Sequence, residues 1–261
     1  MFEFPEYSFA FWIAATFAVL LAGMAKGGFG SGMGAASTPI IALTISAAEA
    51  AALLLPLMLV ADAFAVQHYY RRFDKPSLIQ LVSGAMVGIA LGWFFFGYFR
   101  HNEEVLKMGI GILALGFVLF QILRSILLGS IANRQPHPAQ GVSWGTLAGF
   151  TSTLAHVGGP AVLMHLLPQK LPREVFVGTS ALFFSIVNLV KLIPYGQLGL
   201  LRIDNMMVVI ILAPLAFLGV RAGIMLNKRF TDLWFNRFIY FALTLIAIQL
   251  VAGRNIIELI L

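Results

Sequence analysis

Hydrophobic residues in this chain form long uninterrupted runs, and the length of each run predicts the element that it forms. A helix needs about 20 apolar residues to cross the hydrocarbon core of a membrane. Six runs reach that length, at residues 49–70, 77–99, 104–128, 174–195, 204–227 and 232–252. Two others, at 9–47 and 142–168, each contain a glycine-rich interruption and predict a broken pair of shorter helices. The pattern predicts an all-α polytopic membrane protein.

The interruptions are "GMAKGGFGSGMGAASTP" (23–39) and "GFTSTLAHVGGPAVLMHLLP" (149–168). Unpaired backbone groups are costly in hydrocarbon, so irregular backbone at membrane depth is expected to line a cavity. A helix should begin just after the glycines in each segment, with Pro160 in a first turn, where its missing N–H costs nothing. Two positive helix ends meeting at the midplane would favour an anion. Close helix packing is the alternative use of such glycines, and "GMAKG" fits that pattern.

The two halves of the chain resemble each other at an offset of 126 residues. Residues paired by this offset include Gly32 with Gly158, Asp62 with Asn188 and Tyr69 with Tyr195. Each half, 1–128 and 142–261, then consists of a broken or re-entrant helix pair followed by three transmembrane helices, and 129–141 is a linker.

The charges of the loops indicate how the halves are oriented. Loop Lys and Arg residues divide nine to four between the two sides if the halves are inverted, and seven to six if they are parallel. The positive-inside rule therefore favours two inverted-topology repeats with a cytoplasmic linker. Inverted repeats with broken helices are typical of secondary transporters.

Composition narrows the class of protein further. Hydrophobic residues make up 60% of the chain and charged residues 11%, with a mean hydropathy of +0.91, so a multi-pass protein of the cytoplasmic membrane is expected. The net charge of +6 lies in short connections rather than in one block, which predicts no nucleic-acid partner. The first eight residues contain two acidic and no basic residues, so 9–26 is expected to stay in the mature protein rather than act as a signal peptide.

The sequence shows few features of an enzyme. It has no cysteine, nucleophile elbow, H-E-x-x-H motif, carboxylate cluster or Walker A loop, so no catalysis, metal or cofactor is predicted. Transport without an ATP site must draw on a gradient of the substrate or of a coupling ion.

The two glycine-rich segments and the two-half hydrophobic layout resemble the TauE/SafE family, also called the 4-toluene sulfonate uptake permease family. In the first segment Ser31 and Met33 interleave with the glycines, where the family more commonly has an uninterrupted glycine run. The resemblance implies transport, commonly export, of small sulfur-containing anions such as sulfite, sulfoacetate or other organosulfonates. It supports this class of anion better than any one compound.

Candidate substrate contacts come from both interruptions, and backbone N–H groups are the main ones expected. The candidates are Lys26, Gly28, Gly30, Ser31, Gly32, Gly34, Thr153, His156, Gly158, Gly159 and Pro160. The ammonium of Lys26 would face an anion held by the backbone, or else reach to the membrane surface. The imidazole of His156 would donate a hydrogen bond to a sulfonate oxygen. His165 and His68 lie nearer helix ends and are expected at the interface.

Ionisable residues inside the spans are costly, and they are candidates for function. Asp62 would be the titrating carboxylate of a proton-coupled carrier, or would form a structural pair with a lysine. Its repeat partner Asn188 lies on the same helical face as Lys191. Lys191 and Arg221 are candidates to offset the charge of the substrate.

The expected partners are a small anion, the lipid bilayer and a coupling proton. The oligomeric state stays open, with a homodimer among the options. Two other functions stay open as well: an anion channel, and a proton- or cation-coupled transporter of a different small solute.

Overall fold

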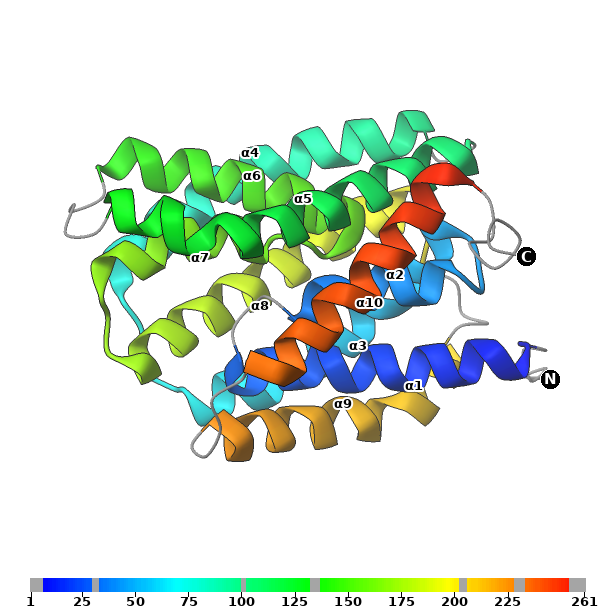
Figure 1. Cartoon of the computed structure of the whole chain (residues 1–261), viewed down its shortest axis with the longest axis horizontal. Helices are drawn as coiled ribbons and strands as arrows, with labels where there is room; N and C mark the ends of the chain where they lie inside the picture. The colour runs from blue at the N-terminus through cyan, green and yellow to red at the C-terminus, as the bar shows by residue number, and fades with distance from the viewer. Residues whose placement is uncertain are drawn as a thin grey trace.

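The computed structural model of the protein describes residues 7–29, 33–99, 102–131, 137–201, 206–227 and 233–253, and these residues form helices and turns (Figure 1). The long helices are α1 (Phe9–Met24), α3 (Ala47–His68), α4 (Lys75–Phe99), α5 (Glu103–Ile131), α6 (Pro138–Ala155), α8 (Arg173–Gln197), α9 (Met206–Asn227) and α10 (Leu233–Ala252). Two short helices, α2 (Ser37–Ala42) and α7 (Gly159–Leu166), follow the glycine-rich interruptions.

Several helices have the length and composition of membrane spans. Six described stretches qualify, at Phe9–Gly28, Ala47–His68, Lys75–Phe99, Glu103–Leu123, Arg173–Gln197 and Met206–Leu226. Five of them coincide with predicted spans, and the sixth is the first arm of a predicted broken pair. The remaining predicted span is α10, whose described apolar stretch is Leu243–Ala252. The prediction of an all-α polytopic membrane protein is confirmed.

Both predicted interruptions break the helix in which they lie. After α1 the chain forms a π-helical turn, Ala25–Phe29, in which Gly28 departs from helical geometry with φ 159° and ψ −11°. A 3-10 turn from Met33 to Ala36 then leads into α2. In the second half α6 ends at His156, whose backbone is left-handed with φ 55°, and α7 begins at Gly159. The chain thus bends at both places where glycines interrupt the apolar pattern.

Corresponding helices of the two halves run in opposite directions. In Figure 1, α1, α3 and α5 run from right to left, whereas α6, α8 and α10 run from left to right. The start of α1 and the end of α10 therefore lie at the same end of the molecule.

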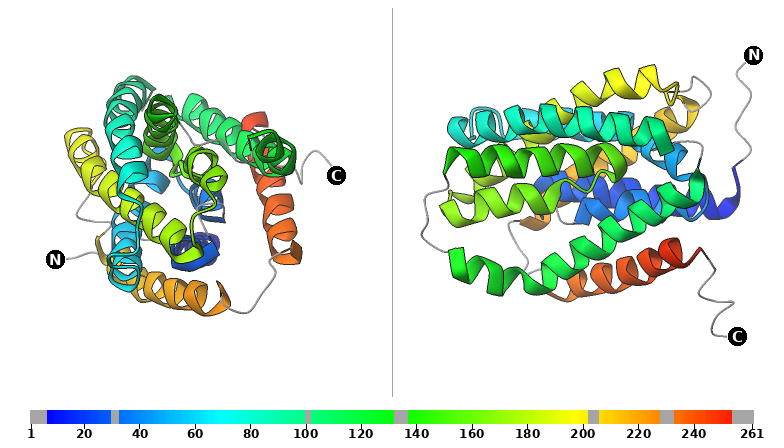
Figure 2. Two further views of the ribbon diagram at one scale, coloured as in Figure 1. Left: turned by 90° about the vertical axis from the view of Figure 1, so that its left-hand side faces the viewer. Right: turned by 90° about the horizontal axis from the view of Figure 1, so that it is seen from above.

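Helices of different halves pack against each other through glycines. Helix α9 packs against α1, and α10 packs against α5 (Figure 2). At the α1–α9 crossing, a Cβ on Gly219 would come 2.7 Å from the carbonyl oxygen of Leu20. At the α4–α6 crossing, a Cβ on Gly88 would come 2.0 Å from the carbonyl oxygen of Thr146. The helices that carry the two interruptions, α1 and α6, are each held by a glycine of the opposite half.

Two details differ from the sequence-based expectation. Helix α5 continues to Ile131 and α6 begins at Pro138, so both helices extend into the segment expected to be a linker. His165, expected at the interface, is only 1% exposed because α7 packs inside the bundle. Its position near a helix end did not predict its burial.

Candidate functional site

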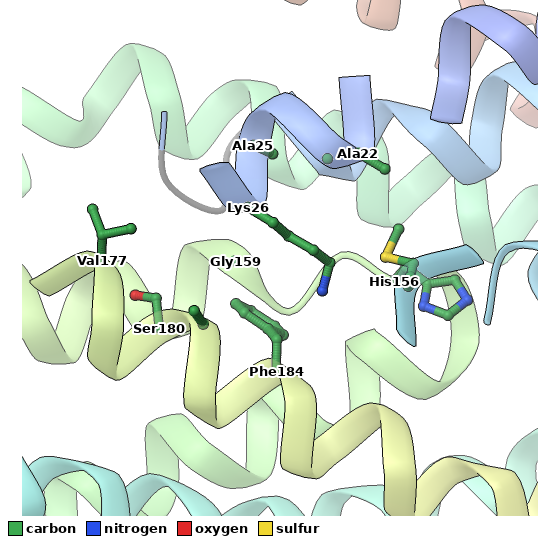
Figure 3. A pocket seen from close by; sticks show the side chains of 11 residues that line it. Ala22, Ala25, Lys26, His156, Gly159, Val177, Ser180 and Phe184 are labelled. Carbon is green, nitrogen blue, oxygen red and sulfur yellow. The ribbon is translucent and has the colours of Figure 1, made fainter. Parts of the chain in front are cut away.

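The two interrupted segments line one shared cavity (Figure 3). The first segment contributes Lys26 and Gly34 to the wall, and the second contributes His156 and Gly159. Helices α3 and α8 complete the wall, chiefly through Met58, Val177, Ser180 and Phe184. The lining is mostly apolar, with a few polar groups, as is usual for sites that bind small molecules.

Lys26 points into the bundle and forms an ion pair with Asp62. The side chains of the two residues are 10% and 1% exposed, respectively. The other carboxylate oxygen of Asp62 accepts a hydrogen bond of 2.7 Å from the amide of Asn188. The ammonium of Lys26 also lies 5.6 Å from the centre of the Phe184 ring, within the range of a cation–π contact. Lys26 therefore faces the cavity rather than the membrane surface.

Lys191 on α8 is fully buried and occupies the second interruption. Its Nζ lies 3.0 Å from the carbonyl oxygen of Ser152, 3.1 Å from the Ser152 hydroxyl and 2.9 Å from Nδ1 of His156. An ammonium carries three N–H donors, and these three acceptors match them.

The contacts of His156 define which ring nitrogen carries its proton. Nε2 lies 3.0 Å from the carbonyl oxygen of Ala51, which only accepts hydrogen bonds, so Nε2 is the donor. Nδ1 then carries the lone pair that accepts from Lys191. With both nitrogens engaged, His156 is a neutral imidazole that fixes Lys191 beside the cavity.

The cluster formed by Lys26, Asp62, Asn188, Lys191 and His156 contains two amines and one carboxyl group. With both amines protonated and the carboxyl group ionised, this cluster carries one excess positive charge. Because charge removed from water without a counter-ion is costly, such a cluster favours an anion in the adjoining cavity.

A matched hydrogen bond supports each interruption from the neighbouring helix. The hydroxyl of Tyr69 donates to the carbonyl oxygen of Gly27 at 2.8 Å, and that of Tyr195 donates to the carbonyl oxygen of Thr153 at 2.7 Å. Both bonds span 42 residues, and the two tyrosines are related by the repeat offset. Each bond satisfies a carbonyl that the broken helix leaves open.

Several sequence-predicted residues lie near the cavity without lining it. Thr153 donates back to the carbonyl oxygen of Gly149 at 2.8 Å, Gly158 caps α7, and Pro160 lies in the first turn of α7. Gly28 provides the bend in the π-helical turn.

Arg221 and the middle of the first interruption lie apart from the described site. Arg221 is exposed on α9, with its guanidinium 5.3 Å from the centre of the Phe217 ring, so the structure does not bring it to the cavity. Gly30, Ser31 and Gly32 lie outside the described residues.

Sequence reasoning missed the contribution of α8 and α3 to the cavity wall. Ser180 is 6% exposed, and its hydroxyl has no hydrogen-bond partner among the described residues. Ser180 and Phe184 lie on the same face of α8 as Asn188, one turn apart, and that spacing would have identified them. The repeat offset also relates Met58 to Phe184, which both line the cavity.

Comparison with known proteins identifies the family. The model of the family described as "Sulfite exporter TauE/SafE" matches residues 15–250, nearly the whole chain. Neither the curated proteins nor the solved structures gave a match. Since the match covers both interrupted segments and α3 to α9 between and beyond them, the chain belongs to the sulfite exporter TauE/SafE family.

Proposed function

We propose that the protein is a secondary transporter that exports a small sulfur-containing anion across the cytoplasmic membrane. Membership of the family implies transport of sulfite or related sulfur anions. The anion would bind in the cavity between the two interrupted segments, beside Lys26 and near His156, with the start of α7 adding the positive end of its dipole.

One observation carries the proposal: the cavity shared by the two interruptions adjoins a buried cluster of two lysines and a single carboxyl group. A cation transporter would need the opposite balance, because a third cation beside Lys26 and Lys191 would be repelled. The hydroxyl of Ser180 adds a hydrogen-bond donor that an oxyanion accepts.

The arrangement of the helices supports transport by alternating access. Corresponding helices run in opposite directions (Figure 1), as in two inverted repeats, and both interruptions meet at the cavity between the halves. In transporters of this design, one repeat moves against the other around a site near the midplane. During this motion, the two helices at each glycine-packed interface, α1 with α9 and α4 with α6, would either move as one unit or slide past each other.

The proposal is tested by exchange of radiolabelled sulfite in proteoliposomes that contain the purified protein. We expect saturable exchange that sulfoacetate and methanesulfonate inhibit and that choline does not. The charge-neutral double variant Lys26→Met/Asp62→Asn removes the cation that lines the cavity, and it should lower exchange roughly tenfold or more.

The matched control is Lys107→Met, which removes a lysine that pairs with Glu103 on α5 away from the cavity. It should exchange sulfite like the wild type. Flux that does not saturate would identify a channel, and exchange of cations but not of anions would overturn the proposed substrate class.

A further inference from the structure

Lys26 is the described cation that lines the cavity, and its charge is already matched by Asp62. Lys191 is not part of the cavity wall, and its three N–H donors are occupied by Ser152 and His156. An anion that binds beside Lys26 therefore competes with Asp62 for the same ammonium. This inference rests on the anion site proposed above and concerns what Asp62 does when that site is filled.

The charge of the anion decides whether Asp62 can remain ionised. A monoanion brings the cluster of Lys26, Asp62, Lys191, His156 and Asn188 from one excess positive charge to neutrality. A dianion brings it to one excess negative charge, which is costly at a site that is buried to this extent. Uptake of one proton by Asp62 restores neutrality in the second case.

Asn188 is suited to bind Asp62 in both protonation states. Its amide nitrogen donates to the carboxylate, while its own amide oxygen is buried and has no partner among the described residues. When Asp62 carries a proton, the carboxylic acid becomes a donor and the free oxygen of Asn188 is an acceptor for it. The side chain needs only to turn its amide group.

No other described group near Asp62 offers an equally available place for the proton. Lys26 and Lys191, as ammonium groups, have no lone pair to accept a proton, and both nitrogens of His156 are engaged. Arg221, on the neighbouring helix α9, is a cation with its side chain exposed. Glu49, the other acidic residue of α3, is bonded to Tyr7 away from the cavity.

We propose that Asp62 takes up a proton when a dianion displaces it from Lys26 and stays ionised when a monoanion binds. The charge of the transported anion would then set the number of protons that accompany it. The step is a transfer of one proton from solvent to a carboxylate oxygen and breaks no covalent bond in the substrate.

The test measures protons taken up on binding, by calorimetry of the purified protein in two buffers with different ionisation enthalpies. Sulfoacetate is the dianion and methanesulfonate the monoanion, because both keep a fixed charge near neutral pH. We expect about one proton per bound sulfoacetate and none per bound methanesulfonate.

Variants assign the proton to its residue. Asp62→Asn keeps Lys26 in the cavity wall and should bind sulfoacetate without proton uptake. Glu49→Gln, which neutralises the other carboxylate of α3, should keep the proton uptake of the wild type.

Equal uptake with both anions, no uptake with sulfoacetate, or uptake that persists in Asp62→Asn would overturn the inference while leaving an anion site in place. Failure of both anions to bind the wild type would reject the proposed function itself.

Discussion

The two interrupted segments occupy matched positions, but they differ in how their lysines are paired. The first pairs Lys26 with Asp62, so a cation is held by an anion. At the matched positions of the second half, Lys26 is replaced by Ser152 and Asp62 by Asn188, both neutral. The cation there is Lys191, held by neutral acceptors. The backbone design is thus shared, while the first segment holds an ion pair and the second holds a lysine among neutral acceptors.

This comparison separates what the repeat preserves from what it does not. The hydrogen bonds of Tyr69 and Tyr195 to the broken helices are equivalent, and so are the glycine crossings that hold α1 and α6. The charged residues are not equivalent, since the first-half counterpart of Lys191 is Ala65. The asymmetry places two lysines but only one carboxyl group in the cluster.

The largest expected effect comes from breaking the ion pair of the first segment. Lys26→Met leaves Asp62 as a buried carboxylate without its cation, and we expect the free energy of unfolding to fall by roughly 3–5 kcal/mol. Denaturant titration of the purified protein in detergent, followed by circular dichroism, measures this change. Lys26→Met/Asp62→Asn should recover most of the loss, and a single variant as stable as the wild type would show that the pair contributes little.

A smaller loss is expected when the cation of the second segment is removed. Lys191→Met leaves three neutral acceptors on Ser152 and His156 without their donor, which should lower the free energy of unfolding by roughly 1–3 kcal/mol. The same titration measures it, with Lys107→Met on α5 as the partly exposed control. Removing Lys191 leaves no unpaired charge, because its acceptors are neutral, whereas removing Lys26 leaves Asp62 unpaired. A larger loss of stability for Lys191→Met than for Lys26→Met would therefore contradict the comparison.

Local sequence patterns were sufficient to predict the spans and the places where helices break. Apolar length and glycine content are properties of a short stretch of chain, and the repeat offset linked Asp62 with Asn188, which are in fact hydrogen-bonded. Lys26 and His156 were predicted because each lies within an interruption. Both line the cavity, and their role in binding an anion stays a prediction.

The rest of the site depends on how the helices are rotated and packed against each other. Lys191 and Arg221 look alike in sequence, as single cations inside apolar runs, yet one is fully buried and the other is exposed. The direction of a side chain follows from the neighbours of its helix, which a single sequence does not specify. For the same reason Ser180 and Phe184 were not predicted to line the cavity.

The glycine crossings test whether the two interruptions are held equally tightly. Gly88→Ala on α4 would place a Cβ 2.0 Å from a carbonyl oxygen of α6, whereas Gly219→Ala on α9 would place one 2.7 Å from a carbonyl oxygen of α1. We expect roughly 1–3 kcal/mol of destabilisation by overpacking, with the larger loss for Gly88→Ala.

Gly109→Ala on α5 is the control for these variants, because its Cβ would meet nothing within 4 Å. It should leave the midpoint of the denaturant titration unchanged or raise it slightly, since alanine favours a helix. A Gly219→Ala variant that is less stable than Gly88→Ala would show that the first interruption is the more tightly held.

The smallest expected effect is that of Ser180→Ala, which should weaken binding of the anion without changing the stability of the protein. Its hydroxyl has no partner among the described residues, so Ser180→Ala should leave the free energy of unfolding nearly unchanged. If the hydroxyl donates to the anion, the variant should lose one neutral hydrogen bond and bind sulfite roughly two- to tenfold more weakly. Ser143→Ala, which removes an exposed hydroxyl bonded to its own helix, is the matched control. Because the position matched to Ser180 in the first half is Leu54, wild-type affinity in Ser180→Ala would mean that the asymmetry between the halves concerns charge alone.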